Sequence, residues 1–173
     1  LESLRRGVRA DTFRDQLQES TVVHLDLAVG GALRAQRRDD IVIVVDALRA
    51  SATIIQCFES GASRVTPVVS ADQLYGDITI GERGGDKIYG ATYGNSPVEL
   101  RSVDLTDQAV VLSSTNGAEC ICASKGLENI VLIGTVLNAR AVAQEALKIA
   151  KELNKNITIL AAGRNNLPAV EDR

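Results

Sequence analysis

The sequence has little of several residue types that carry common enzyme chemistries. It contains one histidine, three cysteines, no methionine and no tryptophan, and aromatic residues make up 3% of the 173 residues. The single histidine, His24, is isolated from the clusters of serine and threonine, which argues against a Ser-His-Asp triad. No apolar run is long enough to cross a membrane, and the charged N-terminus does not resemble a secretory signal. We therefore expect a cytoplasmic protein with no membrane partner.

Charge and cysteine content restrict the partners further. The net charge of −3 and the isoelectric point near 5.2 argue against general binding of nucleic acid. Cys57, Cys120 and Cys122 lie on predicted helices, and a C-x-C pair on a helix directs its thiols apart. We predict three free thiols that pack inside the protein and form neither a disulfide nor a zinc site.

Valine, isoleucine and alanine are abundant, and short apolar runs alternate with helical patterns. This alternation predicts a single α/β domain over residues 1–173, with three α/β/α layers and a mainly parallel sheet that can include a mixed pair. Residues 1–20 are expected to form a peripheral amphipathic helix. The segment after Gly30, which contains Arg34, Arg37 and Arg38, is expected to be a connection with a solvated basic surface. The predicted strands cover residues 21–29, 41–46, 64–69, 78–80, 109–112, 130–133 and 157–160.

Two features suggest that segments are missing. Only residues 70–77 separate two predicted strands, fewer than a parallel crossover normally uses, so either this pair is antiparallel or a helix is absent. The chain has no methionine and stops soon after its last strand and a loop. We therefore expect a portion of a longer chain, with the C-terminal part of the fold beyond residue 173.

The segment from Ile41 to Thr53 is the most informative part of the chain. Five β-branched residues predict a strand that is buried on both faces, and Asp46 ends it. Arg49 follows, and Ser51 and Thr53 lie near the start of the next helix, where free N–H groups attract anions. The alternative is that Asp46 and Ser51 only cap this helix.

Other predicted strands end in similar polar residues. The carboxyl ends of parallel strands lie along one edge of a sheet, so these residues predict one shared site. The glycine-rich segment 81–97 is long enough to be functional, although it could instead form a β-hairpin over residues 87–93. The strand-end residues are Asp46, Arg49 and Ser51; Glu82 and Arg83; Thr115, Asn116 and Gly117; Asn138; and Arg164.

Carboxylates beside anion-binding groups suggest Mg²⁺ with a phosphorylated ligand. Mg²⁺ prefers one or two carboxylates together with water and phosphate oxygens. The common nucleotide-binding motifs G-x-x-x-x-G-K-[ST] and G-x-G-x-x-G are absent, and no D-x-D-x-T follows the strand 41–45. The expected partner is therefore a small anionic phosphoester. The sequence does not set the oligomeric state, and a homo-oligomer is compatible with it.

Several ordered motifs resemble the 2-phosphosulfolactate phosphatase family. They are VVDALRASATI, GERGG followed by YGNSPVE, SSTNGA, and a late A-G followed by E-D, between about residue 41 and residue 172. The resemblance implies Mg²⁺-dependent hydrolysis of 2-phosphosulfolactate to 3-sulfolactate and phosphate, a step toward coenzyme M. It implies catalytic roles for Asp46, Arg49, Glu82 and Arg83, and a metal site of Asp46, Glu82 and Asp172, with Glu171 nearby. The implied substrate-binding residues are Ser51, Thr53, Asn95, Ser96, Thr115, Asn116, Gly117 and Arg164.

Two other functions remain open from the sequence. The protein could be a non-catalytic domain that binds or senses anions, or a phosphatase of another small phosphoester. The number of arginines does not reveal whether a site recognises a sulfonate or a carboxylate.

Overall fold

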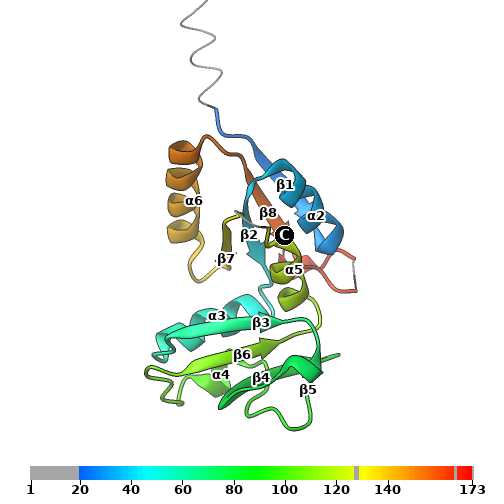
Figure 1. The fold of residues 1–173 in the computed structure, drawn as a ribbon, viewed down its shortest axis with the longest axis vertical. Coiled ribbons are helices and arrows are strands. Elements are labelled where there is room, and N and C mark those ends of the chain that lie inside the picture. Colours follow the sequence, from blue (N-terminus) through cyan, green and yellow to red (C-terminus); the bar gives the residue numbers. More distant parts are fainter. Residues whose placement is uncertain (1–19, 127–128, 166, 173) are drawn as a thin grey trace, which may run out of the picture.

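The computed structural model of the protein describes residues 20–126, 129–165 and 167–172. The predicted N-terminal helix lies outside these residues except for Ser20. Helices and mainly parallel strands alternate through the described chain, which confirms the α/β class with helices layered on strands. These strands form two four-stranded sheets, one above the other in Figure 1, instead of the single sheet expected.

The first sheet is entirely parallel and has the strand order β1-β8-β2-β7. Its central strand β2 is buried on both faces, as its run of β-branched residues predicts. Because side chains alternate along a strand, Ile41 and Ile43 join the core beneath α6, whereas Val42 and Val44 join the core beneath α2 and α5. The elements are β1 (Val23–Leu27), β2 (Ile41–Val45), β7 (Val131–Gly134), β8 (Ile157–Ala161), α2 (Ala28–Arg38), α5 (Gly117–Ser124) and α6 (Ala139–Leu153).

Helix α2 corrects the expectation of a loop after Gly30. A Cβ on Gly31 would lie 2.8 Å from the Asp26 Cβ and 2.9 Å from Leu160 Cδ1, so glycine here allows the helix to pack closely against the sheet. The arginines of α2 are also not merely a solvated surface. Arg34 and Arg38 bind the two oxygens of Asp26, at 2.7 and 2.6 Å, which fixes the helix against β1.

The second sheet has the order β3-β6-β4-β5. β3 and β4 run parallel on either side of β6, so of the two alternatives for this pair the antiparallel one is wrong. A 3-10 turn at Ala71–Gln73 takes the place of a crossover helix between them. β4 and β5 form an antiparallel hairpin with Gly84 and Gly85 at its turn. The elements are β3 (Arg64–Val68), β4 (Ile78–Arg83), β5 (Asp86–Lys87) and β6 (Ala109–Ser113).

Two helices connect the sheets. α3 (Ala50–Glu59) leads from β2 to β3 and packs on the short helix α4 (Pro97–Leu100), and α5 leads from β6 back to β7 (Figure 1). All three cysteines lie on α3 and α5 and are free, as predicted, and burial raises the pKa of Cys57 and Cys120 to about 12. No helix in the described part of the chain is both long and apolar enough to cross a membrane.

Candidate active site

A pocket of about 230 Å³ lies where the carboxyl ends of strands from both sheets meet. The first sheet contributes residues that follow β2 and β8, and the second contributes the end of β4 and the turn after β6. The two sheets therefore build one site from segments that are far apart in the sequence. The lining residues are Asp46, Leu48, Arg49, Glu82, Gly84, Gly85, Asn95, Thr115, Asn116, Gly163, Arg164, Asn165, Glu171 and Asp172.

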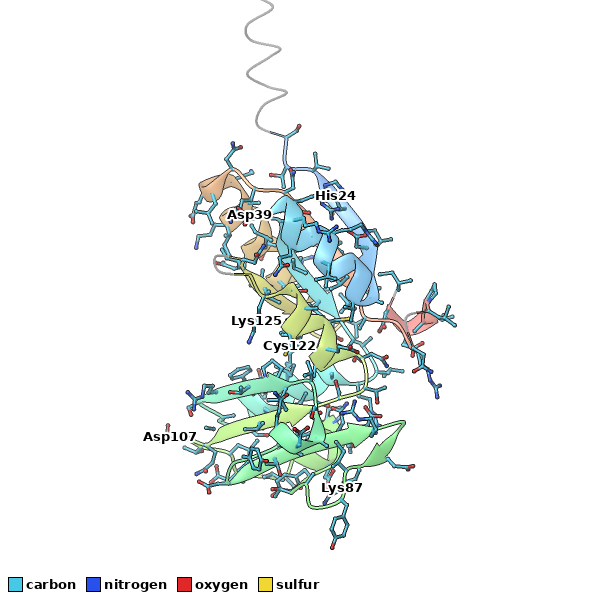
Figure 2. The ribbon with its side chains drawn as sticks, turned by 45° about the vertical axis from the view of Figure 1, so that its right-hand side comes forward. His24, Asp39, Lys87, Asp107, Cys122 and Lys125 are labelled. Carbon is cyan, nitrogen blue, oxygen red and sulfur yellow. The ribbon has the colours of Figure 1, made fainter. Side chains whose placement is uncertain are left out.

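The structure brings nine of the expected site residues into this pocket: Asp46, Arg49, Glu82, Asn95, Thr115, Asn116, Arg164, Glu171 and Asp172. It places five others outside the lining: Ser51, Thr53, Arg83, Ser96 and Gly117. Asn138 also stays apart, because its amide group binds Thr135 and Ile133 at the start of α6. His24 lies on β1, far from β5 at the other end of the molecule (Figure 2), and does not line the pocket.

Asp46 is buried at the end of β2, with 8% of its surface exposed. Its Oδ1 accepts a hydrogen bond from the backbone N–H of Ala50 at 3.2 Å, so it binds the start of α3 as well as lining the pocket. Burial, followed by the negative charge of Asp172, raises the pKa of Asp46 to about 6. At neutral pH the ionised form is therefore held against an electrostatic penalty that a cation in the pocket would relieve.

Two residues outside the pocket fix the position of Asp46. The hydroxyl of the buried Ser51 accepts a hydrogen bond from the Asp46 N–H at 3.0 Å, which holds the end of the strand. The backbone N–H of Gly117 binds the Asp46 carboxylate. A Cβ on Gly117 would collide with Asp46 Oδ2 and lie 2.6 Å from the Ala50 Cβ, so only glycine fits here. Ser51 and Gly117 thus act on Asp46 and do not reach the pocket themselves.

Asp172 brings a second carboxylate close to Asp46. Its two oxygens accept hydrogen bonds from the N–H groups of Ala47 and Gly163, both at 2.9 Å, so it joins the loops that follow β2 and β8. Burial, with the negative charge of Glu171, raises the pKa of Asp172 despite these two hydrogen bonds, which lower it. Asp46 and Asp172 therefore form a fixed, electrostatically strained pair of acids.

Glu82 has a different environment. Burial acts to raise its pKa, but hydrogen bonds from the Gly85 N–H and from both the hydroxyl and N–H of Thr115, together with the charge of Arg49, outweigh this and lower the pKa overall. The Thr115 hydroxyl donates at 2.8 Å and the Thr115 N–H at 3.2 Å. Glu82 is therefore an ionised carboxylate whose oxygens already have several donors.

The arginines divide between the pocket and the second sheet. Arg49 lines the pocket, and its Nη2 donates to the carbonyl of Gly85 at 3.2 Å. Arg164 lines it from the loop after β8. Arg83 instead reaches the hydroxyl of Ser113, at 3.2 Å, and the carbonyl of Val69, beside the ends of β6 and β3. Two guanidinium groups are therefore placed where an anionic ligand could bind.

Several uncharged polar side chains lie in or near the pocket. Asn95 is 4% exposed, and its Oδ1 has no hydrogen-bond partner among the described residues, although the residue lines the pocket. Ser96 caps α4 through the N–H of Glu99, and the hydroxyl of Thr53 is buried without a partner in the described chain. Asn165, which the sequence analysis missed, donates its N–H to Asn116 Oδ1 at 3.1 Å. The only feature of the sequence that pointed to Asn165 was its position just after the end of a predicted strand.

The acids do not form a ready-made metal cage. In residues 20–126, 129–165 and 167–172, no three His, Cys, Asp or Glu side chains are grouped so that they could hold a metal ion, so Asp46, Glu82 and Asp172 are not gathered into one ligand set. Four carboxylates and two guanidinium groups of the described residues nevertheless line the pocket. Its protein charge is therefore negative, which suits a cation accompanying an anionic ligand.

The fold and the pocket define an α/β protein with an acidic, arginine-containing site at the carboxyl ends of its parallel strands. The chain belongs to the 2-phosphosulpholactate phosphatase family, whose model matches residues 30–173. Relatives named "Probable 2-phosphosulfolactate phosphatase" occur in Carboxydothermus hydrogenoformans (33% identity), Thermus thermophilus (33%) and Thermotoga maritima (35%). The matches cover 78%, 77% and 75% of this chain, but 56%, 57% and 56% of those relatives. The chain thus spans just over half their length.

Proposed function

We propose that the protein is a phosphatase that hydrolyses 2-phosphosulfolactate to 3-sulfolactate and phosphate with the help of Mg²⁺. Membership of the family and the names of the relatives support the phosphatase class and the substrate. The observation that carries the proposal is the buried pair Asp46 and Asp172 in one pocket with Arg49 and Arg164. Such a reaction fits the route to coenzyme M that the sequence resemblance implies.

The residues of the pocket fit a magnesium ion. Asp46 and Asp172 are hard oxygen ligands held by backbone N–H groups, and two carboxylates with water and a phosphate oxygen suffice for Mg²⁺. Without a cation, four carboxylates against two guanidinium groups would repel a polyanionic substrate. When bound, the ion supplies positive charge that stabilises the transferring phosphoryl group.

The other residues of the pocket bind and orient the substrate. 2-Phosphosulfolactate carries a phosphate, a carboxylate and a sulfonate, and the planar guanidinium groups of Arg49 and Arg164 offer paired donors to such oxygens. The Oδ1 of the buried Asn95, which no described residue uses, accepts hydrogen bonds and therefore suits the cation or its bound water and not the anionic oxygens of the substrate. Thr115 and Asn116 lie at the turn before α5, on the same side of the pocket as Glu82. Asp46 acts as a metal ligand in this scheme, with attack on phosphorus as the alternative role.

Release of inorganic phosphate tests the proposal. The protein is incubated with 2-phosphosulfolactate and with 2-phospholactate, each with and without Mg²⁺. We expect release from 2-phosphosulfolactate that depends on Mg²⁺ and a much slower rate with 2-phospholactate. Equal rates with both would indicate a phosphatase of another small phosphoester. Binding of the substrate without any release would indicate an anion-binding domain instead.

A further inference from the structure

Glu82 is engaged by donors from two loops of the second sheet. The N–H and hydroxyl of Thr115 bind its two oxygens at 3.2 and 2.8 Å, and the N–H of Gly85 binds Oε1 at 2.5 Å. The parallel register of β4 and β6 sets this geometry, since Gly81 pairs with Ser113 and both chains continue to the same edge. Three donors occupy a carboxylate that was expected to serve as a catalytic acid or metal ligand.

The turn that Glu82 holds consists of two glycines with open space beside them. Gly84 and Gly85 have φ values of +63° and +102°, and a Cβ on either would meet no atom of the described residues within 4 Å. Besides the pairing of β4 with β5 on either side, two further hydrogen bonds hold this turn. Gly85 is held by Glu82, and the N–H of Gly84 donates to the Thr115 hydroxyl at 3.0 Å.

The same turn contacts Arg49 of the first sheet. The carbonyl of Gly85 accepts a hydrogen bond from Arg49 Nη2 at 3.2 Å. Gly85 therefore binds Glu82 through its N–H group and Arg49 through its carbonyl group. Arg49 follows β2, whereas Gly85 lies in the hairpin of β4 and β5. The contact therefore crosses between the sheets at the pocket.

We infer that Glu82 is a positioning residue, which holds the Gly84–Gly85 turn so that the turn directs the Arg49 guanidinium toward the anionic group of the ligand. The inference rests on the proposed function only in taking Arg49 as an anion ligand. It assigns to Glu82 a role other than metal ligand, and it makes Thr115 part of the same support.

A double-mutant cycle on the binding of inorganic phosphate tests this role. Calorimetry measures the affinity of the wild type, Glu82→Gln, Arg49→Met and the double variant for phosphate. Glu82→Gln places an amide N–H group against the donors of Thr115 and Gly85. This change should weaken the binding of phosphate about tenfold, which is the effect of losing a charge-assisted hydrogen bond. The same change in the Arg49→Met background should have almost no effect. Glu152→Gln, on the exposed side of α6, is the matched control and should bind as the wild type does.

Three results would overturn the inference. They are additive losses in the cycle, a wild type that binds no phosphate at millimolar concentration, and a Glu82→Gln variant that needs far more Mg²⁺ but keeps its phosphate affinity. If Glu82→Gln does not fold, Thr115→Val, which removes the hydroxyl that donates to Glu82, replaces it in the cycle. Phosphate binding needs no turnover. A coupled cycle without phosphatase activity would therefore refute only the proposed function, and activity with an additive cycle would refute only the positioning role.

Discussion

Replacing Asp46 by asparagine removes the charge of a buried acid in the pocket and nearly preserves its shape. In the metal-free protein, the pKa of Asp46 is raised from 3.8 to about 6, first by burial and then by Asp172. An acid whose pKa is raised in the folded state binds protons more tightly there than in the unfolded chain. The folded protein consequently loses stability as the pH rises from about 4 to above 6, because ionised Asp46 is disfavoured in the native site.

The magnitude follows from the shift. About two pKa units correspond to about 3 kcal/mol, as an upper estimate for a buried group. The new amide also places N–H donors where Gly117 donates, but this cost is the same at every pH and cancels when two pH values are compared. We therefore expect the change in the free energy of unfolding caused by Asp46→Asn to be about 1 to 3 kcal/mol more favourable at pH 8 than at pH 4.

Urea denaturation at pH 4, 6 and 8 in the presence of a metal chelator measures this difference. Asp77→Asn, at an exposed aspartate, is the control and should show no such trend. A difference between Asp46→Asn and the wild type that stays the same at all three pH values would refute the electrostatic argument. It would mean that Asp46 is better solvated or better paired than its surroundings indicate.

The same variant separates the two roles proposed for Asp46. If Asp46 is a metal ligand, the variant should lose most of its activity, and excess Mg²⁺ should restore part of it. If Asp46 attacks phosphorus, no Mg²⁺ concentration should restore turnover. We expect partial rescue, because Asp172 lies beside Asp46 and remains as a second carboxylate. Activity equal to that of the wild type would remove Asp46 from the mechanism.

Three further changes test other parts of the structure. Gly117→Ala should lower the free energy of unfolding by about 1 to 3 kcal/mol, because the new methyl group collides with Asp46, and thermal melting measures the loss. Gly30→Ala is the control, since a Cβ there would have its nearest neighbour 3.6 Å away. Equal melting temperatures for the two variants would contradict the collision. Arg49→Lys should raise KM about tenfold because lysine cannot donate in pairs; unchanged kinetics would place Arg49 away from the ligand. Replacement of Cys57, Cys120 and Cys122 together by alanine or serine should leave the specific activity of the folded protein intact. A complete loss of activity in folded protein would contradict a packing role for these thiols.

The sequence by itself determined the features that arise from neighbours along the chain. The β-branched run from Ile41 to Val45 becomes a buried strand because no polar residue interrupts it, and Asp46 consequently ends at the edge of the sheet. Ser96 and Pro97 begin α4 as their cap and ring geometry favour. The polar residues after four strands also met at one pocket, since parallel strands present their carboxyl ends on the same side.

Only the tertiary structure decided which of those residues face the pocket and how they ionise. The division into two sheets depends on pairings such as Ile41 with Ile157 and Arg64 with Ala109, which no local pattern specifies. Helix α2 forms across two glycines because Gly31 lies against the sheet, and a propensity argument cannot see that contact. Asp46 and Asp172 repel each other, and hydrogen bonds stabilise the charge of Glu82, because folding brings together carboxylates and donors that are far apart in sequence. Carboxyl groups of similar intrinsic acidity thus acquire pKa values shifted in opposite directions, since burial and neighbours, which exist only after folding, determine the energy of their charges.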